Sequence, residues 1–144
     1  MSQAITEPSM IPRTEQGARQ TLGASAHWAL RAALAGVFIF HGAEKFAGLG
    51  GFAQMMNLPY LVAFLVAAAE FAGGVLILAG GISWDWVTRL GGALLIPVMV
   101  GAITLVHWGQ WSFVPSQGYP MGGSEFQVTL LLISLYFVLK GNRA

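Results

Sequence analysis

Six ionisable side chains interrupt stretches of otherwise apolar sequence. A charged side chain at the centre of a bilayer costs roughly 2.5–3.5 kcal/mol on insertion scales, so such groups usually face a helix bundle or a wet cavity. Imidazole, amine and carboxyl groups gathered in one place can transfer protons or hold a ligand that exchanges them. The six residues are His41, Glu44, Lys45, Glu70, His107 and Glu125.

The composition explains why these residues stand out. Of the 144 residues, 56% are hydrophobic and only 9% are charged, whereas soluble domains have about 25% charged residues. We therefore expect an integral membrane protein surrounded by the lipid bilayer. The net charge is only +1, and the few Lys and Arg residues are scattered, so no basic surface that could bind nucleic acid is expected. Because the chain has no cysteine, it can supply no disulfide, thiolate metal site or thiol relay.

Four apolar segments can carry the polar residues into a membrane. Each is close to the ~20 residues that a spanning helix needs, although the last is the shortest. The sequence thus predicts an all-α fold, an integral membrane four-helix bundle within residues 27–144, preceded by a polar cytoplasmic tail at 1–26. Small residues four apart, Ala32/Gly36 and Ala69/Gly73, are expected at helix contacts. The predicted spans are 28–47, 58–80, 86–108 and 125–140.

The basic residues predict the orientation of these spans. Six of the seven Lys and Arg residues fall on the side of the termini, and only Lys45 falls on the other. The positive-inside rule then places both termini in the cytoplasm, in a bacterial inner membrane. Trp108 and Trp111 fall at the outer interface, where aromatic residues are enriched.

This topology brings ionisable groups from several helices toward the outer side. At 1.5 Å per residue, Glu70 lies roughly 18 Å below the outer surface and His41 roughly 9 Å. We expect a ladder from Glu125, His107 and Lys45 through His41 to Glu70. Such a ladder suits proton movement, or a quinone that exchanges protons with electrons. His41, Glu70 and His107 are the residues expected to bind that quinone.

Structural roles remain open for the residues nearest the surface. Glu44 and Lys45 can form an interfacial pair with Lys45 extended outward, and for Glu44 we favour this role. His107 is equally well explained as an interface residue. Neither histidine belongs to a close ligand cluster, and their depths differ by about one turn, so no metal or haem site is predicted.

Structural roles are also possible for Glu70 and Glu125. Glu125 can be a first-turn acid favoured by the helix dipole, with Ser124 as the N-cap. Glu70 can be a protonated carboxyl that links helices, but such hydrogen bonds average only about 0.6 kcal/mol in a membrane. We therefore favour a functional role for Glu70.

The order of several short motifs resembles the DoxX family over residues 28–143. The motifs are Arg31 before an apolar run and HGAEKF, Glu70-Phe-Ala-Gly-Gly74 before VLILAGG, His107, and Gly122-Gly-Ser-Glu125. The resemblance implies a small four-helix protein of the cytoplasmic membrane that is linked to redox chemistry. The family takes its name from a subunit of an archaeal thiosulfate:quinone oxidoreductase, and mycobacterial relatives are associated with a thiol-oxidant defence complex. By position, the family-like residues are Arg31, His41, Gly42, Lys45, Glu70, Gly73, Gly74, His107 and Glu125.

The C-terminus departs from the pattern associated with many members of that family. The chain ends in Gly141-Asn-Arg143 and Ala144, rather than in a longer Gly-Pro-Gly-Arg-x-Ser-x-Asp sequence. A function that needs the final Asp is therefore in doubt.

Two functional hypotheses follow. In the first, the chain is a quinone-linked oxidoreductase subunit that passes reducing equivalents from a periplasmic donor, such as thiosulfate, to quinone. In the second, it is a non-catalytic accessory or assembly subunit of a larger membrane complex. Both hypotheses expect other membrane or periplasmic subunits as partners. A transporter of small neutral molecules is a weaker third hypothesis, because four helices enclose little space.

Overall fold

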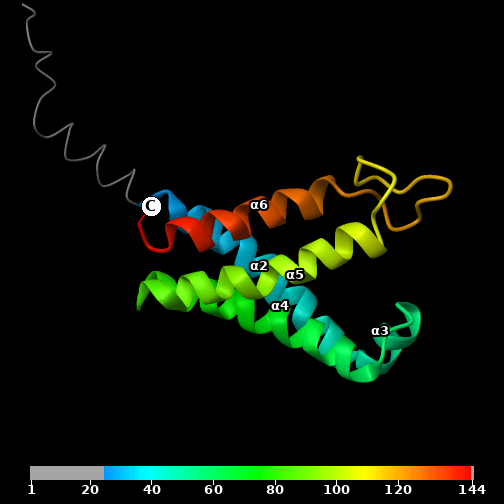
Figure 1. Ribbon diagram of the computed structural model, residues 1–144, viewed down its shortest axis with the longest axis horizontal. Coiled ribbons are helices and arrows are strands. Elements are labelled where there is room, and N and C mark those ends of the chain that lie inside the picture. The colour runs from blue at the N-terminus through cyan, green and yellow to red at the C-terminus, as the bar shows by residue number, and fades with distance from the viewer. Residues whose placement is uncertain (1–24, 144) are drawn as a thin grey trace, which may run out of the picture.

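The computed structural model describes residues 25–143, which form five helices and, within that range, no β-strand (Figure 1). Most of the predicted tail at 1–26 lies outside the described residues. The lone β-bridge joins Ser116 and Tyr119 in the loop before the last helix. The helices are α2 (His27–Ala47), α3 (Leu49–Met55), α4 (Tyr60–Gly81), α5 (Asp85–Leu105) and α6 (Glu125–Lys140).

Each of the four predicted segments forms a helix, with one difference in length. Helices α2, α4 and α6 begin and end within two residues of the predicted bounds, whereas α5 ends at Leu105 rather than at residue 108. Helix α3 lies in the connection between the first two segments and was not predicted from the sequence. Gly48 ends α2 with non-helical angles of φ −123° and ψ 35°, and α3 then leaves at 96° to α2.

The helix lengths support a multi-pass membrane protein. Helices α4 and α5 are long and apolar enough to cross a bilayer, and α2 with α3 forms a third, bent candidate. Helix α6 has 16 residues and is therefore about 24 Å long, which is short for an apolar core of about 30 Å. The crossing by α6 and the cytoplasmic termini thus stay predictions.

Successive long helices pack against one another, and glycines allow the close approaches. Figure 1 shows α4 and α5 side by side, with α6 along α5. A Cβ at Gly73 would lie 2.5 Å from the Leu95 side chain, and one at Gly92 would lie 2.7 Å from the Ser134 carbonyl. Gly73 therefore lies at a helix contact as predicted. The Gly36 prediction was wrong, because nothing lies within 4 Å of a Cβ there.

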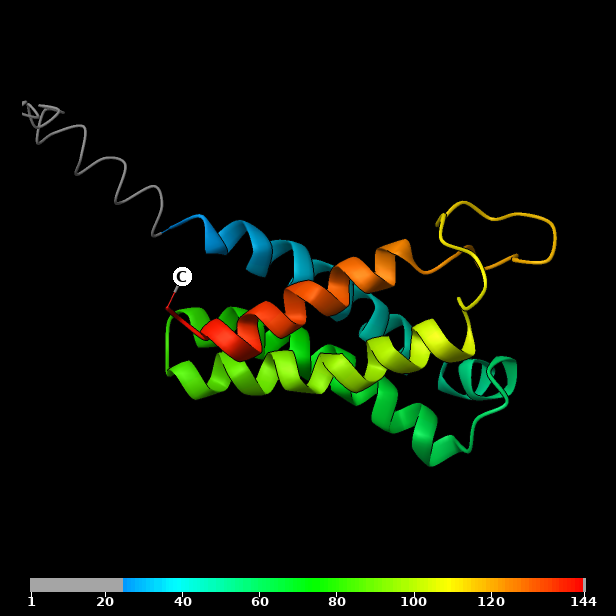
Figure 2. The same cartoon turned by 45° about the horizontal axis from the view of Figure 1, so that its top comes forward.

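The core of the bundle is apolar and lies where the four long helices meet. Its fully buried side chains include Leu34 and Phe38 of α2, Ile77 of α4, Leu95 of α5 and Phe137 of α6. Toward α3 and the 106–124 loop, the helix ends spread apart (Figures 1 and 2).

Arg31 is fully buried at the end of the bundle where the chain terminates. Its Nη1 donates to the Ile77 carbonyl at 2.5 Å and to Thr88 Oγ1 at 3.0 Å. Its Nη2 donates to the Gly141 carbonyl at 3.4 Å and to Asn142 Oδ1 at 2.8 Å. Arg31 therefore ties α2 to α4, to α5 and to the residues after α6. We call this group the Arg31 cluster: Arg31, Ile77, Thr88, Gly141 and Asn142.

The segment after α6 is fixed by further bonds to the Arg31 cluster and to α5. The Asn142 amide Nδ2 donates to the Gly80 carbonyl at 2.8 Å, and its backbone N–H donates to Asp85 at 2.7 Å. Asp85 also accepts from Arg89 at 2.6 Å. The short C-terminal sequence, which departs from the family pattern, thus has a structural role of its own.

Candidate functional site

Lys45 and Glu70 form an ion pair between α2 and α4, with 2.6 Å between Lys45 Nζ and Glu70 Oε2. The pair is possible because α2 and α4 come very close one turn away, where a Cβ on Gly42 would lie 2.6 Å from the Phe71 backbone nitrogen. The Glu70 side chain is 5% exposed and that of Lys45 20%. Lys45 thus turns inward to Glu70 and does not form the interfacial pair with Glu44 considered above.

A cavity of about 990 Å³ adjoins the ion pair. This volume is at the upper end of the roughly 300–1,000 Å³ that small-molecule sites occupy. Its walls come from α2, α3, α4 and α5 and are mostly apolar, with polar groups at a few points. The lining includes Phe52, Met55, Val62, Val66, Pro97, Val98, Ala102, Leu105 and Met121 beside His41, Glu44, Lys45, Glu70 and His107.

The ion pair keeps hydrogen-bonding capacity that faces the cavity. An ammonium has three donors and a carboxylate has two acceptor oxygens. Among the described residues, Lys45 Nζ donates only to Glu70 Oε2, and Glu70 Oε1 has no protein donor. The Lys45 Nζ also lies 5.3 Å from the centre of the Phe52 ring of α3. A ligand oxygen in the cavity can therefore accept from Lys45 or donate to Glu70.

His41 lies at the rim of the cavity rather than between Lys45 and Glu70. Its side chain is 50% exposed, and its Nδ1 lies 3.6 Å from Glu44 Oε2. The expected ladder through His41 to Glu70 was therefore wrong in its order, since Lys45 reaches Glu70 directly. His41 and Glu44 instead form a separate, exposed pair on α2 that also lines the cavity.

His107 lines the same cavity, but both of its ring nitrogens have protein partners. Nδ1 lies 3.1 Å from the Gly122 carbonyl, which can only accept, so Nδ1 carries the proton of that bond. Nε2 lies 3.0 Å from the Gln127 amide nitrogen and accepts from it. These bonds tie the end of α5 to the loop and to α6, and they orient the ring.

The structure does not bring Glu125 to the cavity. Glu125 is half-buried at the start of α6, and its backbone N–H donates to the Trp111 carbonyl at 3.0 Å. Ser124 occupies the N-cap position, but its side chain makes no capping bond and donates to the Gln110 carbonyl instead. Ser124 therefore takes the expected N-cap position, but without a side-chain capping bond.

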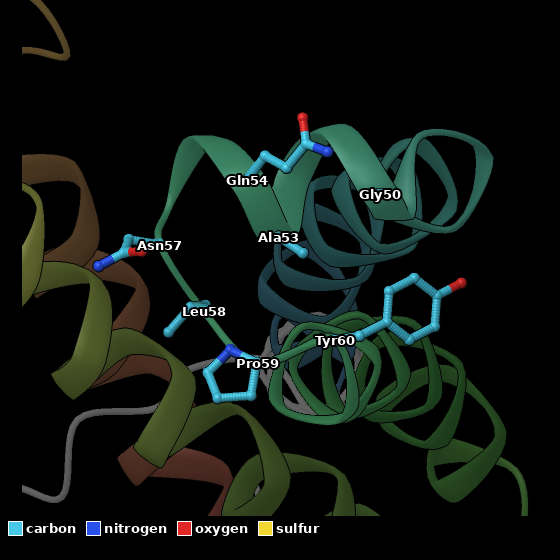
Figure 3. Close-up of a pocket in the computed structure, with 7 residues that line it drawn as sticks. All are labelled: Gly50, Ala53, Gln54, Asn57, Leu58, Pro59 and Tyr60. Carbon is cyan, nitrogen blue, oxygen red and sulfur yellow. The ribbon is translucent and has the colours of Figure 1, made fainter.

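A second hollow lies against the other side of α3 (Figure 3). Its volume is about 540 Å³, and it is lined by Gly50, Ala53, Gln54, Asn57, Leu58, Pro59 and Tyr60. In Figure 3, the side chains of Gln54 and Tyr60 point away from residues 57–59 in the segment that connects α3 to α4. None of the lining residues is a carboxylate, an amine or an imidazole. This hollow therefore offers less chemistry than the cavity beside Lys45.

No three His, Asp or Glu side chains within residues 25–143 come together as ligands for a metal ion. Of the sequence-predicted site residues, His41, Lys45, Glu70 and His107 line one cavity, and Glu125 lies apart. The sequence analysis missed the contribution of α3, above all Phe52. The sequence feature that could have indicated this contribution is Phe52 itself. It is an aromatic residue seven positions after Lys45, and Gly48 between the two can turn the chain.

Comparison with known proteins identifies the family to which this chain belongs. The sequence profile of the DoxX family matches residues 26–108, a range that includes every cavity residue except Met121. The chain is also 34% identical over 110 residues to a protein of Bacillus subtilis (strain 168) named "Putative oxidoreductase CatD", with 74% of this chain and 72% of that protein covered. No solved structure matches the chain. The family match extends over more than half of the sequence, and the chain belongs to the DoxX family.

Proposed function

We propose that this protein is a redox-associated membrane protein that binds a quinone in the cavity beside Lys45 and Glu70. The observation that carries the proposal is a partly buried ion pair with unused donors and an unused acceptor in the wall of a large apolar cavity. The name of the B. subtilis relative, an oxidoreductase, agrees with this role.

The ion pair suits both redox forms of a quinone. A quinone presents carbonyl oxygens, which can accept a hydrogen bond from the Lys45 ammonium. A quinol presents hydroxyl groups, which can donate to Glu70 Oε1. One site can therefore hold the molecule before and after reduction, and the apolar walls suit its ring and tail.

Reduction of a quinone to a quinol consumes two electrons and two protons. The electrons come from a donor outside this cavity, for which the DoxX resemblance implies a periplasmic compound such as thiosulfate. Two thiosulfate ions that join through one new S–S bond into tetrathionate release the two electrons. We propose that the protons enter at the rim through His41 and Glu44 and reach the quinone through Lys45 and Glu70. His107 orients the opposite part of the cavity wall through its bonds to the loop and α6.

This role sets the expected location of the protein. The distribution of basic residues supports a bacterial inner membrane with both termini in the cytoplasm. The cavity then opens toward the periplasmic side, where a donor or a partner subunit can approach. Residues 27–144 form the membrane domain in this proposal, and residues 1–26 a cytoplasmic tail.

The test begins with the full chain purified from its native membrane in a mild detergent. We expect quinone in the lipid extract, and we expect the Glu70→Gln variant to lose it. Glu125→Gln makes the same chemical change as Glu70→Gln at the same end of the bundle but outside the cavity, so it should retain quinone. Thermal unfolding of each variant separates loss of binding from loss of folding.

The outcome also decides between the two functional hypotheses. If the folded Glu70→Gln variant retains quinone, the ion pair is not part of the quinone site. Absence of quinone from the wild-type protein, together with a stoichiometric larger partner, would make the chain an accessory subunit and the ion pair a structural link.

A further inference from the structure

Most glycines in the long helices are explained by helix packing. A Cβ at Gly42, Gly73 or Gly91 would lie 2.6, 2.5 or 2.9 Å from the nearest atom of a neighbouring helix. Larger residues there would push the helices apart. Such glycines are needed even though glycine loses more backbone entropy on folding than any other residue.

Gly51 of α3 and Gly101 of α5 differ from these packing glycines. No atom of residues 25–143 lies within 4 Å of a Cβ at either position, which is also true of Gly36 and Gly50 outside the cavity. Neither backbone has the positive φ that favours glycine, so other residues could adopt the same conformation. Packing and backbone geometry therefore leave both glycines unexplained.

Both of these glycines line the cavity of about 990 Å³ beside the ion pair. A glycine in a cavity wall exposes bare backbone, which lets a flat molecule approach more closely than any side chain would allow. The same cavity contains the buried Glu70 side chain, with one oxygen that lacks a protein donor. The cavity wall therefore combines two positions without a side chain, Gly51 and Gly101, with a carboxylate oxygen of Glu70 that can bind a ligand.

We propose that Gly51 and Gly101 are specificity-determining residues that make room for the flat ring of a quinone, including the two-ring naphthoquinone class. This inference rests on the proposed quinone function. The ring lies against the bare backbone of α3 and α5, and its oxygens reach Lys45 and Glu70. A side chain at either position would occupy space beside the ring, and a two-ring quinone has less room to move away from it.

The test compares ring sizes on the full chain in detergent micelles. Binding of a short-tailed benzoquinone and a short-tailed naphthoquinone is measured by isothermal titration calorimetry. Gly101→Ala is expected to weaken naphthoquinone binding about tenfold, within the usual cost of overfilling a packed site, and to weaken benzoquinone binding less than about threefold. Gly101→Leu and Gly51→Leu are expected to abolish binding of both.

Gly36→Leu is the matched control. Gly36 is also a helical glycine with nothing within 4 Å of a Cβ, but it lies outside the cavity lining. This variant should bind both quinones as the wild type does and unfold at the same or a higher temperature, because leucine favours a helix more than glycine does. It separates the effect of a leucine in a helix from that of a leucine in the cavity.

The two proposals fail in different ways. If the wild type binds neither quinone, the proposed function is overturned and this inference with it. If the wild type binds and folded Gly101→Ala, Gly101→Leu and Gly51→Leu bind equally well, only the inference about the glycines is overturned. Equal weakening of both ring sizes by Gly101→Ala would contradict selection by ring size.

Discussion

Each end of the helix bundle holds an inward-facing cation, fully buried Arg31 at one end and partly buried Lys45 at the other, and the two differ in their surroundings. At the end with the C-terminus, Nη1 and Nη2 of Arg31 make four bonds to protein oxygens, and among its nitrogens only the buried Nε has no partner in the described residues. Its guanidinium also lies 4.8 Å from the centre of the Phe137 ring. At the other end, Lys45 has a carboxylate partner in Glu70 and a cavity beside it.

The difference separates a structural charge from a charge available to a ligand. Removing a charge from water costs several kcal/mol, and hydrogen bonds with good geometry must offset that cost. The Arg31 cluster uses neutral oxygens of four other residues for this purpose. The Lys45–Glu70 pair balances its charge with a single contact and leaves donors and an acceptor facing open space. Burial alone therefore does not distinguish a candidate binding site, whereas unused hydrogen-bonding capacity beside a cavity does.

The largest expected effect on stability comes from Arg31→Met, which removes the cation of the Arg31 cluster. Several buried oxygens then lack donors, at about 1–3 kcal/mol each, so we expect a loss of roughly 3–5 kcal/mol in the free energy of unfolding. Thermal unfolding followed by circular dichroism measures it. If the variant unfolds like the wild type but no longer binds quinone, the roles assigned to the two ends are reversed.

A smaller effect is expected for Asn142→Ala at the same end. The variant loses the side-chain bonds to Arg31, Thr88 and Gly80 but keeps the backbone bond to Asp85. We expect a loss of about 1–3 kcal/mol, measured by the same unfolding experiment. Arg143→Ala, at the exposed neighbouring residue, should leave the unfolding temperature unchanged. Equal destabilisation by both variants would show that the cluster is not the cause.

The smallest effect on stability is expected where both partners of the open pair are replaced, in the double variant Lys45→Met/Glu70→Leu. Replacing a whole buried ion pair with apolar residues of similar size is often neutral or stabilising. We expect the free energy of unfolding to change by no more than about 1 kcal/mol or to rise, while quinone binding is lost. Unfolding and calorimetric titration of the same sample measure both. Marked destabilisation without loss of binding would make the pair structural.

The helices could be predicted from the sequence because their signal is local. Long apolar runs define α2, α4 and α6 to within two residues. Helix α3 has only seven residues, LGGFAQM, and two of them are glycine, so it has neither the length nor the composition of a predicted helix. The 106–124 loop begins earlier than predicted because the helical bonds of α5 end with Val106 and His107, whose N–H groups share the Ala102 carbonyl.

The site was only partly predictable, because periodicity places residues on faces but does not identify neighbours. His41, Lys45, Glu70 and His107 were chosen as costly polar groups in apolar segments, and they line one cavity. The direct bond from Lys45 to Glu70 depends on how closely α2 approaches α4 at Gly42, which only the packed structure reveals. Glu125 was grouped with them by depth alone.

If redox chemistry takes place in the cavity as proposed, the methionines of its wall would become oxidised. Three of the six methionines in the chain, Met55, Met56 and Met121, line the cavity. Thioethers are oxidised to polar, chiral sulfoxides, so a reactive oxygen species produced by a stray electron at the site would meet them first. Peptide mass mapping of sulfoxide at these positions, with buried Met99 of α5 as the internal reference, would report where in the molecule redox chemistry has taken place.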